Sequence, residues 1–206
     1  MLKIIFTLAD LLFPPSKEAL LVRQIEKPIL ERLYRPKETG GIVSISSYQN
    51  ISIQALITQN KFHFNKTAAR ILSQLLYRWL IEHYGTKNVI LVPVPLSKER
   101  RLKRGHNQVE TILSLLPAHH NFSIVPSLLQ RVIDTPPQTS LTRAERLVNM
   151  TRAFTTDYAA MQKYKNTTII IIDDVMTTGA TVHAARATLA PHVPVHCTLH
   201  CVTLAH

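Results

Sequence analysis

The sequence predicts an α/β fold in which a doubly wound, mostly parallel sheet is flanked by helices. Two apolar runs, residues 88–94 and 167–172, are typical of central strands of a parallel sheet; the first leads through prolines to a basic segment and the second ends at two aspartates. Helical and extended patterns alternate along the rest of the chain, which is the order of a doubly wound sheet. With 206 residues, 46% of them hydrophobic, the chain has enough apolar material for one full core.

The expected elements follow one another in this alternating order. A strand at 42–48 precedes a helix at 51–59 and a long helix at 66–84, whose apolar residues share one face and which Gly85 ends. A strand at 88–94, a helix at 107–116 and a short strand at 123–125 come next. The last elements are a strand at 167–172, a helix at 180–190 and a strand at 193–204.

Residues 1–41 are expected to form a short helical appendage to the main domain at 42–206, because prolines and the Gly40-Gly41 pair divide them into short pieces. The leucine-rich residues 1–13 predict an amphipathic packing helix. This run is far shorter than the ~20 residues that span a bilayer, and Asp10 interrupts it, so we expect no membrane span. The polar residues 131–154 predict a mobile hood loop.

The pattern that bears most directly on function lies at residues 169–181, where an apolar strand ends at Asp173 and Asp174. Two adjacent carboxylates offer several acceptor sites to neighbouring hydroxyls, such as those of a ribose. The turn that follows is rich in threonine hydroxyls and leads into a helix whose first N–H groups form an anion site. Gly179 allows the backbone to approach a phosphate closely. The pattern therefore predicts a site for a ribose 5-phosphate.

This run closely resembles the phosphoribosyl pyrophosphate (PRPP) signature of type I phosphoribosyltransferases, an apolar strand followed by D-D-x-x-T-T-G-x-T. The resemblance implies the type I phosphoribosyltransferase fold, with Asp173 and Asp174 as catalytic residues that bind the ribose hydroxyls. It also implies a 5-phosphate loop made of Val175, Met176, Thr177, Thr178, Gly179, Ala180 and Thr181. Two plainer interpretations remain, a strand and helix joined by a threonine cap and an acidic metal-binding pair, but neither accounts for the whole run.

A second apolar strand is followed by a dense basic segment at residues 98–104. Such a cluster is often only a solvated surface or a patch that binds nucleic acid. In the phosphoribosyltransferase fold, however, the loop at this place binds pyrophosphate, which requires N–H donors and positive charge. On this resemblance the candidate pyrophosphate ligands are Pro95, Lys98, Arg101 and Arg104.

Further motifs narrow the resemblance to competence proteins of the ComF type. These proteins carry a P-V-P-L segment, present here at 93–96, and an R-G-F-N-Q motif, present at 104–108 with His106 in place of phenylalanine. Looser matches are Tyr48, the Lys61-Phe62 pair and a spaced set of Gln138, Leu141, Arg146, Asn149 and Phe154. In the hood loop, Gln138, Arg143 and Arg146 are candidates for closing over PRPP.

One departure from ComF-type proteins concerns zinc. Most of them have zinc-ribbon cysteines after an F-P-P turn, whereas here Phe13-Pro14-Pro15 is followed by Ser16 and Lys17, and no cysteine precedes Cys197. We therefore expect no zinc site. Cys197 and Cys201 are four residues apart in a predicted strand, about 13 Å at the usual rise, so we expect free thiols.

Together these motifs predict a pentosyltransferase that uses PRPP and releases pyrophosphate, with Mg²⁺ as cofactor bound through PRPP rather than by direct protein ligands. The ComF resemblance implies a link to DNA uptake, with single-stranded DNA and a competence helicase or other uptake machinery as partners. A net charge of +11 fits such polyanions, although only 6% of the residues are aromatic, too few for a long base-stacking platform.

Two alternatives remain open, a non-catalytic competence factor that binds single-stranded DNA and a regulator that senses PRPP. The unpaired cysteines and the lack of a secretion signal predict a cytoplasmic protein in each case. The acceptor of the phosphoribosyl group cannot be read from the sequence.

Overall fold

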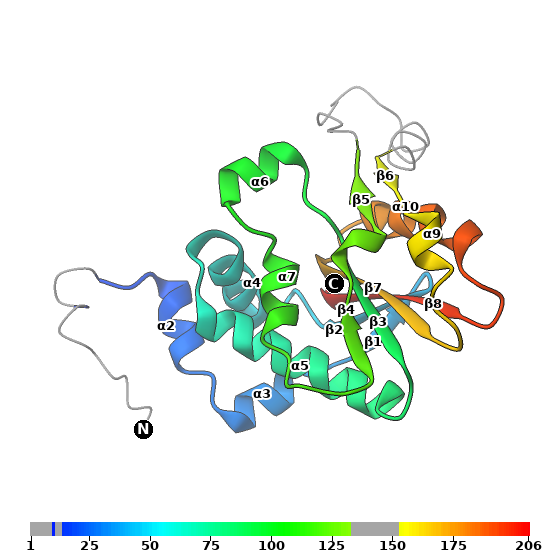
Figure 1. Cartoon of the computed structure of the whole chain (residues 1–206). Helices are drawn as coiled ribbons and strands as arrows, with labels where there is room; N and C mark the ends of the chain where they lie inside the picture. Colours follow the sequence, from blue (N-terminus) through cyan, green and yellow to red (C-terminus); the bar gives the residue numbers. More distant parts are fainter. Residues whose placement is uncertain (1–9, 11–13, 133–152) are drawn as a thin grey trace.

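The computed structural model describes residues 10, 14–132 and 153–206 (Figure 1). Its main sheet has the strand order β1-β2-β8-β7-β3-β4, in which only the β1–β2 pair is antiparallel. The strands are β1 (Lys37–Thr39), β2 (Ile42–Ser46), β3 (Val89–Pro93), β4 (Phe122–Ile124), β7 (Thr168–Val175) and β8 (Thr198–Ala205). A separate antiparallel ribbon joins β5 (Gln130–Arg131) to β6 (Phe154–Thr155).

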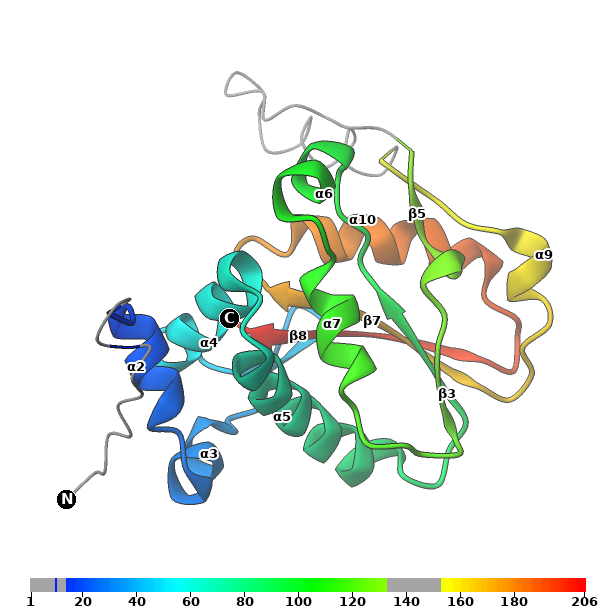
Figure 2. The same cartoon turned by 60° about the vertical axis from the view of Figure 1, so that its left-hand side comes forward.

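The central strand β7 is buried on both faces, and its alternate side chains enter two separate cores. Ile170 and Ile172 pack with α4 (Ile51–His63), α5 (Lys66–Tyr84) and α7 (Gln108–Ser114), whereas Ile169 and Ile171 pack with α10 (Ala180–Leu189). Figure 2 shows α5 and α10 on opposite sides of β7 and β8. The predicted α/β class, with a mostly parallel sheet flanked by helices, is confirmed.

Several elements differ from the prediction in their bounds or in their type. β7 continues to Val175 because β8 runs beside it and offers backbone partners as far as Ala205. The last strand begins at Thr198 rather than at residue 193, since the 3-10 turn η2 (Ala190–His192) and Pro194 come before it. The basic segment, predicted as a loop, forms the helix α6 (Lys98–Arg104), which is capped by Ser97 and ends at Gly105 in the left-handed conformation.

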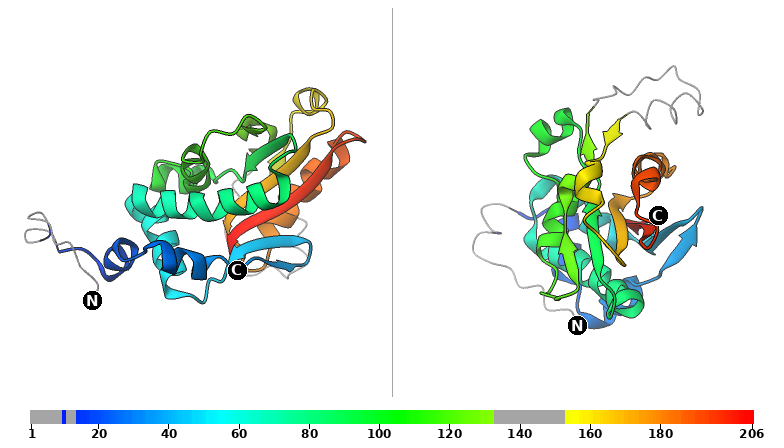
Figure 3. Two further views of the ribbon diagram at one scale, coloured as in Figure 1. Left: turned by 90° about the horizontal axis from the view of Figure 1, so that it is seen from below. Right: turned by 45° about the vertical axis from the view of Figure 1, so that its right-hand side comes forward.

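The described part of the N-terminal appendage packs against the main domain. Ser16 caps α2 (Lys17–Arg23) by accepting the N–H of Ala19 at 3.2 Å, and Val22 of this helix is buried in the core that contains α4. The next helix, α3 (Lys27–Leu33), lies against α5 in the same core, beside the sheet (Figure 3). β1 precedes the predicted boundary at residue 41 but pairs with β2.

Two predicted features fall largely outside the described residues, namely the helix over 1–13 and the interior of the hood loop. The β5–β6 ribbon joins the two ends of that loop. Two short helical segments, η1 (Pro126–Leu128) and α9 (Tyr158–Met161), flank the ribbon along the chain. Of the helices that the structure describes, none combines the length and the apolar character required to cross a membrane.

Candidate functional site

A cavity of about 310 Å³ opens at the carboxyl ends of β3 and β7. This end of a parallel sheet is where ligands bind in open α/β folds. Its wall is formed by residues from both strands and from the helices and loops beyond them: Tyr48, Lys61, Val94, Pro95, Leu96, Arg100, Gln108, Arg131, Asp173, Asp174, Val175, Thr177 and Thr181. The cavity therefore brings the acid pair, the threonine turn and several cations together.

The two acids of the pair have different surroundings, and the pleat of β7 explains why. Consecutive side chains of a strand point to opposite faces. Asp174 points to the face covered by α4 and α7, where its Oδ2 accepts Gln108 Nε2 at 2.9 Å and lies 2.8 Å from Lys61 Nζ. Its Oδ1 accepts the N–H of Val175 at 2.7 Å. Asp174 is therefore a buried carboxylate whose two oxygens are both engaged.

Asp173 is half-buried and makes fewer contacts. Its Oδ1 accepts the N–H of Asp174 at 2.9 Å, and no side chain in the described residues forms a hydrogen bond to it. Burial, followed by the negative charge of Asp174, raises the pKa of Asp173 to about 7, although the Asp174 N–H, Lys61 and Arg100 act in the opposite direction. A carboxyl with such a pKa at a cavity wall is suited to accept a proton, or a hydrogen bond from a hydroxyl group of a ligand.

The turn between β7 and α10 presents backbone donors beside this pair. Gly179 has φ of +73°, and a Cβ at this position would lie 3.1 Å from His183 Cδ2, so the turn requires glycine. No protein acceptor within the described residues is found for the N–H groups of Thr177, Thr178 and Thr181. Thr177 and Thr181 also line the cavity. Together these groups form a site for an anion at the start of a ten-residue helix.

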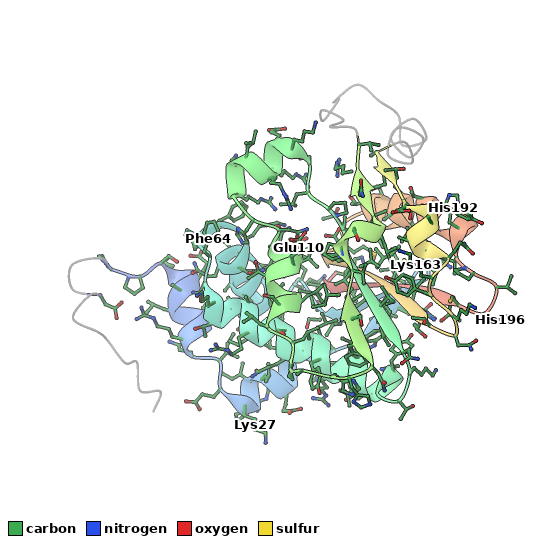
Figure 4. The ribbon with its side chains drawn as sticks, viewed as in Figure 1. Lys27, Phe64, Glu110, Lys163, His192 and His196 are labelled. Carbon is green, nitrogen blue, oxygen red and sulfur yellow. The ribbon has the colours of Figure 1, made fainter. Side chains whose placement is uncertain are left out.

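The basic helix α6 contributes to the cavity through one residue. Arg100 lines it, whereas Lys98, Arg101 and Arg104 do not, although all three were predicted as pyrophosphate ligands; the predicted Pro95 does line it. Arg101 Nη2 lies 3.8 Å from Glu110 Oε1, on α7 (Figure 4). Arg101 and Lys103 are exposed and Arg104 is partly buried, and no residue of α6 is fully buried.

Arg104 and His106 pack against two aromatic side chains that follow Lys61. The Arg104 guanidinium lies 5.3 Å from the centre of the Phe62 ring, and burial lowers its pKa. The His106 ring lies 4.1 Å from that of Phe64, at the end of α4 (Figure 4). His106, which replaces the phenylalanine of the ComF motif, thus keeps an aromatic contact between the basic segment and α4.

Sequence reasoning did not assign Tyr48, Lys61, Arg100, Gln108 and Arg131 to the cavity. Tyr48, Lys61 and Gln108 belong to the ComF motifs, so the sequence marked these residues but did not indicate that they line the cavity. The hood-loop candidates Gln138, Arg143 and Arg146 lie outside the described residues. Of the predicted 5-phosphate loop, Met176 is buried and Ala180 begins α10.

The remaining ionisable clusters do not form a second site of this kind. Cys201 is buried and Cys197 partly buried, and both are free thiols, as predicted. Burial raises the pKa of Cys201 to about 11, which makes it a poor nucleophile. Across residues 10, 14–132 and 153–206, no three His, Cys, Asp or Glu side chains gather closely enough to hold a metal ion.

Comparison with curated proteins finds three informative relatives. Competence protein ComFC of Bacillus subtilis (strain 168) is 38% identical over 109 residues, which are 52% of this chain and 40% of that protein. Competence protein F of Haemophilus influenzae is 28% identical over 134 residues, 65% of this chain and 58% of that protein. DNA utilization protein YhgH of Escherichia coli (strain K12) is 28% identical over 154 residues, 73% of this chain and 66% of that protein.

Each match thus spans less than two thirds of the relative's own length. No protein-family model matches the chain. A solved structure of adenine phosphoribosyltransferase from Leishmania tarentolae gives a TM-score of 0.44 at 11% identity, and the match covers 83% of this chain and 94% of that one. The predicted similarity to ComF-type competence proteins is confirmed by the named relatives.

Proposed function

We propose that this homologue of ComF-type competence proteins binds PRPP with Mg²⁺ and transfers its phosphoribosyl group to a nucleophile, releasing pyrophosphate, as part of DNA uptake. The observation that carries the proposal is the convergence of three unlike groups on one cavity. Carboxylates suit the ribose hydroxyls, the N–H groups at 177–181 suit the 5-phosphate, and the cations Arg100 and Arg131 suit the pyrophosphate.

The chemistry requires mainly orientation and charge stabilisation. The C1–O bond breaks with its electron pair leaving on pyrophosphate, and the nucleophile forms a bond to C1 from the opposite face. Asp173 is the carboxyl available to hold a ribose hydroxyl or to take the proton that the nucleophile loses. Arg100 stabilises the negative charge that grows on the leaving group.

Mg²⁺ suits this site because carboxylate and phosphate oxygens are the hard ligands that it prefers. When bound, it would offset charge on the leaving pyrophosphate. The described residues hold no ready cluster of three metal-binding side chains, so we expect the ion to arrive with PRPP.

The test is pyrophosphate release from PRPP with a panel of nucleobases, with and without Mg²⁺ and with and without an oligonucleotide. We expect Mg²⁺-dependent release that the double substitution Asp173→Asn, Asp174→Asn abolishes, while the exposed carboxylate substitution Glu26→Gln leaves it unchanged. Release that persists in the double variant would contradict the proposal. PRPP binding without release under any condition would instead support the sensing role.

A specific observation also favours binding of single-stranded DNA. The helix α6 exposes a row of cations beside the exposed rings of Phe62 and Phe64, next to the cavity mouth. Backbone phosphates and a few stacked bases would fit such a surface. A cytoplasmic location and a helicase or uptake-channel partner are part of this proposal. An affinity for an oligonucleotide that does not fall as the salt concentration rises would contradict the proposal that the protein binds single-stranded DNA.

A further inference from the structure

Two helices far apart in the sequence meet at one oxygen of the acid pair. Lys61, in the last turn of α4, lies 2.8 Å from Asp174 Oδ2, and Gln108, in the first turn of α7, donates to the same oxygen at 2.9 Å. The neighbouring Asn60, 2% exposed, donates its Nδ2 to the carbonyl oxygen of Gln108 at 3.3 Å. This last bond fixes α4 against α7, so the amine and the amide are held together around Asp174.

We propose that Lys61, assisted by Gln108, is a positioning residue that balances the charge of Asp174 and fixes its orientation, which leaves Asp173 as the carboxylate that meets the ligand. The inference rests on the function proposed above for the cavity. It assigns different roles to two acids that the sequence motif presents as equivalent.

The physical reason lies in the cost of burying two adjacent carboxylates. The side chain of Asp174 is 8% exposed and that of Lys61 is 21% exposed, so water screens their attraction only in part. Without the amine, the two adjacent carboxylates would stand with less positive charge beside them, and the pair would take up a proton more readily. Asp174 would also lose the partner at its Oδ2, and its orientation towards the ligand would no longer be fixed.

Other charged groups also face the acid pair and set the background for this effect. They are Arg100 and Arg104 from α6, which act on it at a distance, and Arg131 from β5 at the cavity wall. Tyr48 and Gln108 complete the polar surroundings. Of the described cations, Lys61 is the one that forms an ion pair with Asp174.

A double-mutant cycle tests whether Lys61 acts through Asp174. We expect Lys61→Met and Asp174→Asn each to weaken PRPP binding about 10- to 100-fold, and the double variant to be no weaker than Asp174→Asn alone, within about two-fold. Lys61→Arg should recover part of the affinity because it keeps the charge. Lys66→Met, an exposed lysine at the start of α5, is the matched control and should bind within about two-fold of wild type. Losses that add in the double variant would show direct contact between Lys61 and PRPP and would overturn the positioning role.

A second measurement needs no ligand and separates this inference from the proposed function. Titration of the aspartate carboxyl carbons by NMR should give an apparent pKa for the acid pair that rises by about one unit in Lys61→Met and stays constant in Lys66→Met. Gln108→Leu should give a smaller rise in the same direction. An unchanged titration in Lys61→Met overturns the inference, even if wild type binds no PRPP. A raised titration with no PRPP binding would preserve the role of Lys61 and refute the proposed ligand.

Discussion

The turn at 177–181 and the helix α6 were both predicted from the sequence to bind phosphate groups, yet they meet the cavity in different ways. The turn follows a strand buried on both faces, so its direction is fixed by the sheet. α6 has no buried residue and brings Arg100 alone of its cations to the cavity wall. The comparison teaches that positive charge in a sequence indicates a phosphate-bearing partner. Which charged side chain reaches the cavity is fixed only where the segment is attached to the core.

The largest expected effect tests which cation of α6 reaches the ligand. Arg100→Ala should weaken PRPP binding by about 10- to 100-fold, because charged hydrogen bonds are worth about 1.5–3 kcal/mol. Arg101→Ala, whose side chain is 64% exposed and lies near Glu110, should change the affinity less than about two-fold. Calorimetric titration compares the two, and equal losses would remove the distinction between them.

The glycines of the two regions offer a second comparison, since both have a left-handed backbone. Gly179→Ala should reduce the free energy of unfolding by about 2 kcal/mol and weaken PRPP binding by about 10-fold, because φ is +73° and the new Cβ would lie 3.1 Å from His183. Gly105→Ala, with φ of +72° and its nearest atom 3.7 Å away, should cost about 1 kcal/mol and leave binding largely intact. Urea unfolding and PRPP titration measure both; similar binding by the two variants would contradict the comparison.

A third, smaller effect concerns the contribution of Asp173 to the free energy of unfolding. Because the pKa of Asp173 is raised from 3.8 to about 7, the native state holds more protons than the unfolded state between these values, and stability falls as pH rises through them. Asp173→Asn should therefore raise the free energy of unfolding by about 1–2 kcal/mol at pH 8 and by less at pH 5. Unfolding curves at the two pH values check this, and a variant less stable than wild type at pH 8 would contradict it.

The smallest expected effect tests the outward face of α6. The double substitution Arg101→Ala, Lys103→Ala should reduce the salt dependence of oligonucleotide binding by about 1.4 in the slope of log K against log salt, because each lost phosphate contact on a single strand contributes about 0.7. PRPP affinity should stay unchanged. Fluorescence anisotropy across a salt series measures the slope, and an unaltered slope would place DNA elsewhere on the protein.

Much of the fold and the acid pair could be predicted because the information is local. Four consecutive isoleucines indicated a strand buried on both sides, and Asp173, Asp174 and Gly179 followed it at the spacing of a known signature. The end of β7 was placed three residues too early, since its last pairs depend on β8, which lies far along the chain.

The remaining site residues could not be predicted because they depend on contacts between distant elements. Lys61 and Gln108 reach Asp174 only once α4 and α7 pack on the same face of the sheet. The choice of Arg100 over its neighbours depends on the helical rotation of α6, which a basic segment without apolar residues does not reveal. The sequence showed the positive charge of this segment but not the direction in which each of its side chains points.

The four isoleucines of β7 have a consequence for how this strand tolerates change. Because 169–172 are identical, a slip of one position along the neighbouring strands would keep isoleucine at three of the four core places and bring Thr168 or Asp173 to the fourth. The same slip would exchange the two aspartates between the faces and leave Lys61 beside the wrong one. The residues at the two ends of the run, above all the aspartates, therefore specify the pairing register of β7, and the isoleucines between them contribute little to it.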